Sequence, residues 1–99
     1  MSRENSATIA HWAETTFGPL NSLATLVDRA QQELSELRET LARNGSPSEI
    51  AHEAADVTIL LHRLVALAGH DLSAAVDDKM SINRQRRWIP SGDGVGQHI

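Results

Sequence analysis

Two pairs of acidic residues have the types and the spacing that metal chemistry needs. Glu33 and Glu36 are three positions apart, and so are Glu53 and Asp56. Side chains three apart project from the same face of an α-helix, and carboxylate oxygens are the ligands that hard divalent cations prefer. If the two pairs meet in the fold, their four negative charges require cations.

A helix-stop and helix-start signal, Asn44-Gly45-Ser46-Pro47, lies midway between the two pairs. The midpoint of each pair is ten residues from the Asn44/Gly45 junction. At a rise of 1.5 Å per residue, both pairs lie roughly 15 Å from the turn. The sequence therefore predicts an antiparallel helical hairpin that holds four carboxylates at one level.

The helix predicted for residues 20–43 places the first pair at the edge of its apolar face. Its apolar residues recur at intervals of three and four and fill one arc roughly 100° wide. They are Leu23, Leu26, Val27, Ala30, Leu34, Leu37 and Leu41. An acid pair of this spacing is usually a solvated helix face, but Glu33 and Glu36 fall beside the arc, and so they border the core.

The second pair lies on a helix predicted for residues 47–68 that is apolar on more than one side. Glu53 and Asp56 share a stripe with Leu60 and Leu67, which predicts partial burial. Buried carboxylates cost several kcal/mol unless they are paired or bind metal. Three arginines are near enough to pair with them, namely Arg29, Arg38 and Arg63. Metal is the better explanation of the four acids together.

Two flanking helices are predicted, and each carries a candidate ligand contact with a structural alternative. Trp12, on a helix over residues 5–16, is either a core or interface anchor or a ring that stacks on a ligand base. Lys79, Asn83 and Arg86 form a row on a helix over residues 72–87. This row is either a solvated helix end that favours the helix dipole or, beside a metal cluster, a phosphate-binding face.

Composition limits the classes that remain. The 99 residues suit one domain, and the absence of cysteine excludes thiolate catalysis and disulfides. No run approaches the roughly 20 apolar residues of a membrane span, and no signal peptide is evident at the start. These features predict a soluble cytoplasmic protein with no membrane partner. The glycine-rich residues 89–99 do not match a nucleotide fingerprint and are predicted to form a flexible tail.

The acid pairs, followed by a K-x-x-x-N motif at Lys79 and Asn83, resemble the MazG-like all-α nucleoside triphosphate pyrophosphohydrolases. Their signature is E-x-x-E on one helix and E-x-x-D on the next. The opening from Trp12 to Pro19 resembles the small phage and bacterial dATP/dGTP branch of this family. The resemblance covers about residues 8–88, and Gln32 departs from it where many relatives have an extra glutamate.

The resemblance implies a four-helix bundle with a central helical hairpin, assembled as a homodimer or homotetramer. The domain would span residues 1–88, with residues 89–99 as its tail. It would act in the cytoplasm of a bacterial cell or of a phage-infected host. Its substrate would be a nucleoside triphosphate, specifically a purine deoxynucleotide such as dGTP or dATP.

The implied reaction is cleavage between the α and β phosphates, which yields the monophosphate and pyrophosphate. Mg²⁺, or Mn²⁺ in its place, would be held by Glu33, Glu36, Glu53 and Asp56. Cations at this position neutralise the triphosphate and activate the attacking water, with Glu36 or Glu33 as the residue that takes its proton. Further contacts would come from Lys79 and Arg86 to phosphate oxygens, from Asn83 to a phosphate or sugar, and from Trp12 to the base.

Two other classes of function stay open. One is a non-catalytic helical oligomerisation module, in which the acids pair with arginines of a partner chain. The other is nucleic-acid binding through Arg84, Arg86 and Arg87, which the net charge of −4 disfavours. Neither alternative explains the matched acid pairs, so we expect an enzyme with no nucleic-acid partner.

Overall fold

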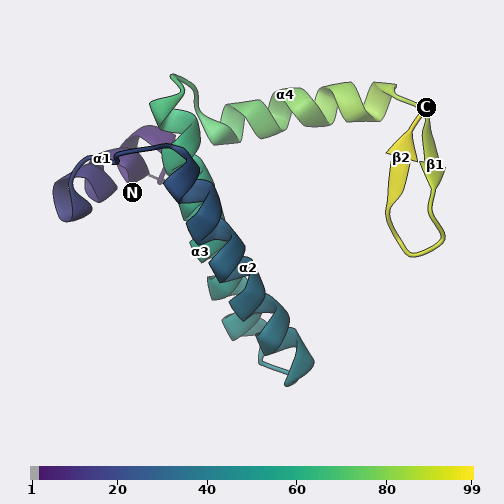
Figure 1. Ribbon diagram of the computed structural model, residues 1–99. Helices are drawn as coiled ribbons and strands as arrows, with labels where there is room; N and C mark the ends of the chain where they lie inside the picture. Colours follow the sequence, from purple (N-terminus) through teal and green to yellow (C-terminus); the bar gives the residue numbers. More distant parts are fainter. Residues whose placement is uncertain (1–2) are drawn as a thin grey trace.

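The computed structural model describes residues 3–99, and four helices dominate it (Figure 1). They are α1 (Ser6–Phe17), α2 (Ala24–Ala42), α3 (Pro47–Leu67) and α4 (Leu72–Gln85). The four predicted helices are thus confirmed. The largest difference is at the start of α2, which the sequence predicts near Leu20. There, Ser22 instead accepts hydrogen bonds from Ala24 and Thr25, so a turn precedes the helix.

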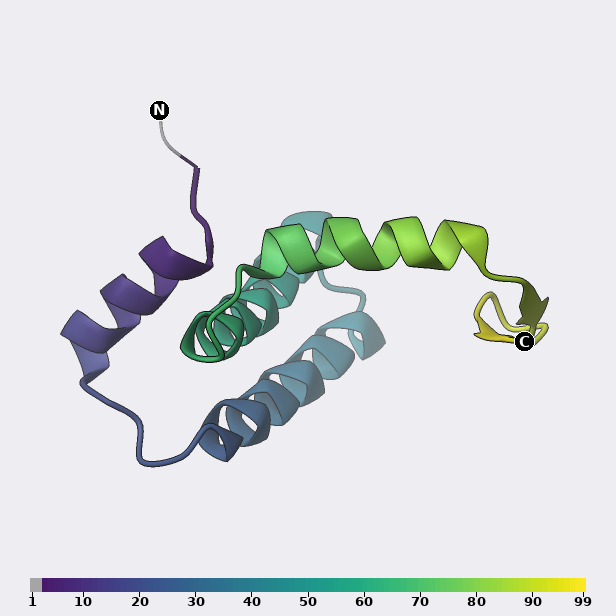
Figure 2. The ribbon, with the colours of Figure 1, turned by 90° about the horizontal axis from the view of Figure 1, so that it is seen from above.

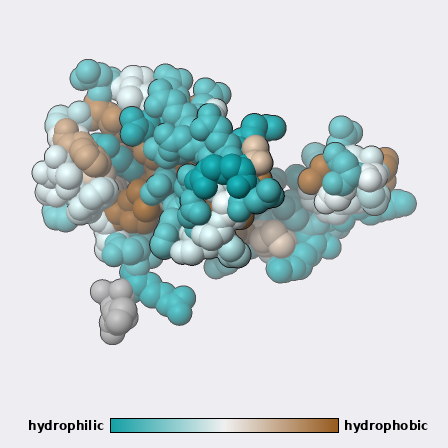
Figure 3. Space-filling model, turned by 90° about the horizontal axis from the view of Figure 1, so that it is seen from below, coloured by the Kyte–Doolittle hydropathy of each residue, from teal (hydrophilic) through white to brown (hydrophobic). Residues whose placement is uncertain are grey.

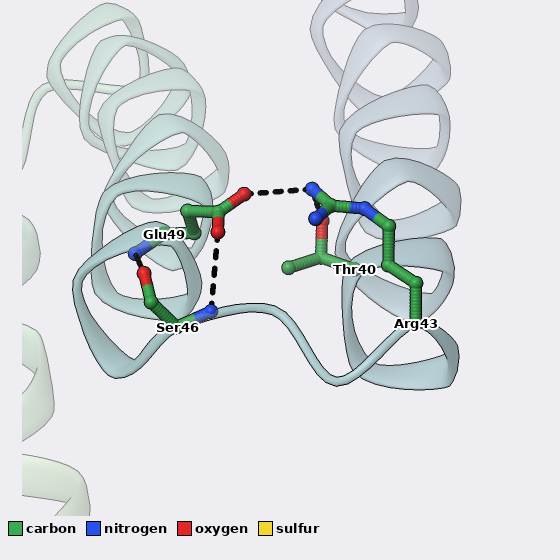
Figure 4. A network of polar contacts seen from close by, with 4 residues as sticks. All are labelled: Thr40, Arg43, Ser46 and Glu49. Atoms are coloured by element: carbon green, nitrogen blue, oxygen red, sulfur yellow. Dashed lines mark hydrogen bonds and ion pairs between the residues drawn. The ribbon is translucent and has the colours of Figure 1, made fainter.

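A polar network closes the predicted hairpin between α2 and α3 (Figure 4). Asn44 takes a left-handed conformation with φ 58°, which ends α2. The Ser46 hydroxyl accepts from the Glu49 amide, and the Glu49 carboxylate accepts from the Ser46 amide, each at 3.1 Å. Arg43 donates to the same carboxylate at 2.7 Å, and this contact is the first cause of the lowered pKa of Glu49. Ser46 and Glu49 therefore form a capping box at the start of α3.

The apolar core of a single chain is small. Among the described residues, the buried apolar side chains are Ile9, Ala13, Leu26 and Ala30. They lie where α1 and α2 both pack on α3. Three polar residues, Ser6, Thr40 and Arg63, are as deeply buried as these. Hydrogen bonds of Ser6 and Arg63 therefore join the elements alongside apolar contact.

One buried polar network centres on Ser6, which is 1% exposed and joins α1 to α3 and to the start of α4. Its hydroxyl lies 2.7 Å from His62 Nδ1 and accepts from the Leu72 amide at 2.7 Å. Its own amide donates to Asp71 at 3.0 Å, and Asp71 also caps α4 by accepting from Ala74. The Ser6 amide is the first cause of the lowered pKa of Asp71.

Beyond this network, α4 leaves the other helices at a bend of 95° from α3 and projects into space (Figures 1 and 2). None of its side chains is buried. The predicted four-helix assembly is therefore not closed within one chain. No single helix in residues 3–99 is long and apolar enough to cross a membrane, and α3 and α4 reach that length and composition only together, across their bend.

The predicted flexible tail contains a β-hairpin instead. Strand β1 (Trp88–Pro90) pairs antiparallel with β2 (Gly96–His98), and the turn places Gly92 and Gly94 at positive φ. The Trp88 ring meets the His98 ring edge to face at 5.8 Å. A glycine-rich composition favours flexibility, but here two glycines supply the backbone conformation that a turn requires.

We expect Ser6→Ala to lower the free energy of unfolding by about 1–3 kcal/mol, because the Leu72 amide would lose a buried hydrogen-bond acceptor. Urea denaturation followed by circular dichroism measures the change. Ser35→Ala is the matched control: Ser35 is exposed on α2 and bonds only to its own helix at 3.2 Å. Its effect should stay within about 0.5 kcal/mol, and equal stabilities of the two variants would contradict the role given to Ser6.

Candidate functional site

One acid of each predicted ligand pair lines a cavity of about 530 Å³ between the hairpin and α1. Glu33 reaches it from α2 and Asp56 reaches it from α3. The Glu33 side chain is 14% exposed, whereas Asp56 is exposed. The lining is Trp12, Phe17, Leu20, Thr25, Leu26, Arg29, Glu33, Asp56, Ile59, Leu60 and Arg63. One hollow thus combines two acids, two bases and a largely apolar wall, as ligand pockets commonly do.

Glu36 is exposed on α2, and its electrostatics tie it to the other acids. The pKa of its carboxyl group is raised above the ordinary value, first by a hydrogen bond with Glu33 and next by repulsion from the Glu33 charge. Glu53 adds a smaller repulsion from α3, whereas Arg29 acts in the opposite direction. Acids from both helices therefore lie close enough to repel one another.

Glu53 carries the clearest mark of a missing partner. It is half-buried on α3, and its Oε1 atom is buried without any hydrogen-bond partner among the described residues. A buried carboxylate oxygen left unpaired is costly. Such an oxygen can coordinate a divalent cation, so the chemistry of Glu53 fits a metal ligand.

The four acids do not form a finished metal site as they stand. Within residues 3–99, no three Asp, Glu or His side chains lie close enough together to hold a metal ion. Glu33, Glu36, Glu53 and Asp56 are neighbours along the hairpin, but their carboxylates would have to draw together to share a cation. Their assignment as ligands stays a prediction.

Two arginines line the cavity in addition to the residues predicted from the sequence. Arg63 is buried on α3, donates to the Gly18 carbonyl at 2.9 Å and lies 3.5 Å from the Glu14 carboxylate. Arg29 is exposed on α2, with its Nε 3.5 Å from Glu33 Oε1. The sequence marks both arginines only as possible partners of the acids, because a spacing of one or two helical turns from an acid is too common to indicate a ligand contact.

Trp12 stands at the wall of the cavity rather than in the core. It is 53% exposed and meets Phe17 edge to face at 5.4 Å. It also lines a second hollow of about 440 Å³ together with Glu4, Ile9 and Ile59. The core interpretation of Trp12 is therefore wrong. Its ring is available to a planar ligand or to a neighbouring chain.

The predicted phosphate-binding row is not brought to the acids within one chain. Lys79 and Asn83 lie on α4, and Arg86 caps its end. Residues 72–99, which comprise α4 and the C-terminal β-hairpin, form an arm that projects away from the α2–α3 hairpin (Figure 2). Lys79 and Arg86 are exposed, and Asn83 is half-buried with its Oδ1 unpaired among the described residues. The Asn83 carbonyl accepts from the Trp88 indole at 2.7 Å, which fastens the C-terminal hairpin to α4.

Comparison with known proteins shows similarity along nearly the whole chain. A family model described as dATP/dGTP pyrophosphohydrolase matches residues 6–99. A dATP/dGTP diphosphohydrolase of Salmonella phage PMBT28 is 37% identical over 91 residues, which are 92% of this chain but only 29% of that protein. A dATP/dGTP diphosphohydrolase of Cyanophage S-2L is 33% identical over 96 residues, which are 97% of this chain and 86% of the relative.

A solved structure shares the fold. It is described as the Cyanophage S-2L MazG-like pyrophosphohydrolase bound to dGDP and three catalytic Mn²⁺ ions per active site. Its TM-score to this chain is 0.71 at 31% identity, and the match covers 95% of this chain and 92% of that one. The family model, which matches residues 6–99, extends through the C-terminal hairpin.

The unpaired Glu53 oxygen predicts that Glu53→Gln removes metal-dependent stabilisation without harming the metal-free fold. Adding Mn²⁺ or Mg²⁺ at 100 times its Kd should stabilise the wild type by about 2.7 kcal/mol through mass action, and the variant by far less. The metal-free variant should be at least as stable as the wild type, since one repelling charge is gone. Thermal melts with metal or with a chelator measure both effects.

Glu39→Gln is the control, because Glu39 is an exposed glutamate near the end of α2, the other helix of the hairpin. Its melting temperature should rise with metal as the wild type's does. A lower metal-free melting temperature for Glu53→Gln would indicate instead that Glu53 stabilises the fold through an ion pair.

Proposed function

The chain belongs to the dATP/dGTP pyrophosphohydrolase family, and on this basis we propose that it hydrolyses a purine deoxynucleoside triphosphate. The products are the nucleoside monophosphate and pyrophosphate, and the substrate is dATP or dGTP. The Salmonella phage relative is much longer than this chain, so the proposal concerns the activity of the shared domain. The phage origin of the relatives supports action inside an infected host cell.

The observation that carries this proposal is the composition of the cavity. An exposed aromatic ring, Trp12, lines the same hollow as Glu33 and Asp56. A volume of about 530 Å³ lies within the range of roughly 300–1,000 Å³ that small-molecule sites occupy. A nucleotide has the matching polarity, with a flat base at one end and charged phosphates at the other. Trp12 is then suited to stack on the base while the phosphates approach the acids.

We assign the four acids, Glu33, Glu36, Glu53 and Asp56, as ligands of a divalent cation, Mg²⁺ or Mn²⁺. Bound there, the cation would offset the charge of the triphosphate and favour attack by water at the α phosphorus. The unpaired oxygen of Glu53 supports this assignment, as does the presence of Mn²⁺ in the structural relative.

Of the four acids, we propose Glu36 as the proton acceptor. It is exposed on α2 and lies one helical turn from Glu33. Glu33 is less suited because its side chain is only 14% exposed. In this scheme Glu36 orients the attacking water and removes its proton, and Glu33 positions Glu36.

A second copy of the chain is needed to supply the phosphate-binding row. Lys79, Asn83 and Arg86 lie on an arm that leaves its own hairpin (Figure 1). The arm also exposes many large apolar side chains, and apolar patches are visible on the helical body as well (Figure 3). On the arm they are Val76, Met80, Ile82, Trp88, Ile89, Val95 and Ile99.

An arm of this kind is poorly stable without a partner. Helices shorter than roughly 12–15 residues are marginal in water, and so is an isolated two-stranded hairpin. We therefore propose a homodimer or homotetramer in which the arm of one copy covers the body of another and brings Lys79 and Asn83 to its acids. A non-catalytic oligomerisation module would use the same apolar surface but would leave the four acids without a role.

The reaction predicts a specific label pattern. When dGTP or dATP is incubated with Mg²⁺ or Mn²⁺ in ¹⁸O-water, we expect dGMP or dAMP and pyrophosphate, with ¹⁸O in the monophosphate. Asp56→Asn should lower kcat on the order of 100-fold or more, because it removes a metal ligand. Asp28→Asn, at an exposed acid on α2 that does not line the cavity, is the control. Nucleoside diphosphate and orthophosphate as products would reject the proposal.

The shared site predicts complementation between inactive variants. Lys79→Ala and Asp56→Asn, each nearly inactive alone, should recover activity when the two chains are mixed and reassembled, because some sites then contain no lesion. A mixture of Glu53→Gln and Asp56→Asn should not recover activity. Each acid set comes from a single chain, so every site in the mixed assembly still contains one altered acid. Sedimentation should show a dimer or tetramer at micromolar concentration. A stable monomer would contradict the proposal.

A further inference from the structure

Arg29 occupies an unusual position for a basic residue, at the mouth of an acidic site. It lies on α2 one helical turn before Glu33 and lines the same cavity as Glu33 and Asp56. Its side chain is 63% exposed, while the Glu33 side chain it meets is 14% exposed. The charged end of Arg29 therefore remains open to solvent and to an incoming ligand.

The contact between Arg29 and Glu33 is loose. The ion pair joins Nε to Oε1 at 3.5 Å, and no hydrogen bond of the Arg29 guanidinium is found within residues 3–99. Ion pairs with an exposed partner contribute little to stability. Arg29 can thus leave Glu33 at low cost.

The other basic side chains are committed elsewhere or distant. Arg63 also lines the cavity, but it is buried and held by the Gly18 carbonyl. Lys79 and Arg86 lie at the arm, away from the acids of their own chain. Among the described residues that line the cavity, Arg29 is therefore the one basic side chain that is exposed.

From this placement we propose that Arg29 is a phosphate-binding residue that pairs with Glu33 only until the nucleotide arrives. The inference rests on the proposed function, because it requires a triphosphate substrate and a cation held by Glu33. Once the Glu33 oxygens serve as ligands, they no longer need the guanidinium. The planar fork of an arginine matches phosphate oxygens and can donate two hydrogen bonds to them.

This exchange predicts opposite effects on the two ligands. Removing Arg29 weakens binding of the triphosphate, because a charge-assisted contact is lost. The same change does not weaken binding of a divalent cation in the absence of nucleotide, because Glu33 loses a competing partner. A residue that merely shaped α2 or the cavity would weaken both kinds of binding together.

The test compares Arg29→Gln and Arg29→Lys with Arg38→Gln in the full-length chain. Arg38 is exposed on α2, so its variant makes the same change of charge on the same helix outside the cavity. Calorimetry measures binding of the non-hydrolysable α,β-imido analogue of dGTP with Mn²⁺ present. Electron paramagnetic resonance measures binding of Mn²⁺ alone, and circular dichroism checks that each variant is folded.

We expect Arg29→Gln to raise the Kd for the analogue by about 10-fold or more and to leave the Kd for Mn²⁺ alone unchanged or lower. Arg29→Lys should be intermediate because it keeps the charge but loses the fork, and Arg38→Gln should match the wild type. If the wild type binds the analogue and Arg29→Gln binds it equally well, the proposed role of Arg29 is overturned. Loss of Mn²⁺ binding in Arg29→Gln would overturn it too, and neither result would contradict the proposed function. If the wild type binds neither Mn²⁺ nor the analogue, the proposed function fails with it.

Discussion

The antiparallel packing of α2 on α3 is the constraint on which the rest of this protein depends. The turn between them has little slack, since a Cβ at Gly45 would collide with Thr40, which is 1% exposed. Arg43 and the Ser46–Glu49 capping box close its other side. Each residue inserted into a helix rotates the later side chains by about 100° around its axis, so a longer turn that extended α3 would carry Glu53 away from Glu36.

Holding acids together in this way works against stability. Contact with Glu33 raises the pKa of Glu36, and Glu53 keeps a buried oxygen without a partner. Nothing in the core requires these groups to be acidic, and apolar residues of similar size would avoid the repulsion. Acids maintained at such a cost are typical of a site that is completed by its ligands.

The projecting arm, like the acids, has groups that lack partners within one chain. One chain buries few apolar side chains, while α4 and the C-terminal hairpin leave theirs exposed. The direction of the arm is set at its base by Ser6, which binds His62 on α3 and the Leu72 amide at the start of α4. In the proposed assembly, a buried hydroxyl far from the acids thus decides where Lys79 and Asn83 are presented.

The sequence by itself determined the four helices, the hairpin and the level of the acids along it, because apolar periodicity, capping residues and turn residues act locally. The tertiary structure alone decided the course of α4, since this depends on contacts such as Ser6 to Leu72, 66 positions apart. It likewise decided that Arg29 shares a cavity with Trp12, because that requires α1 to be placed against the hairpin. The C-terminal hairpin could not be predicted from the sequence for another reason: glycine permits both a disordered chain and a tight turn, and only pairing of the flanking strands selects between them.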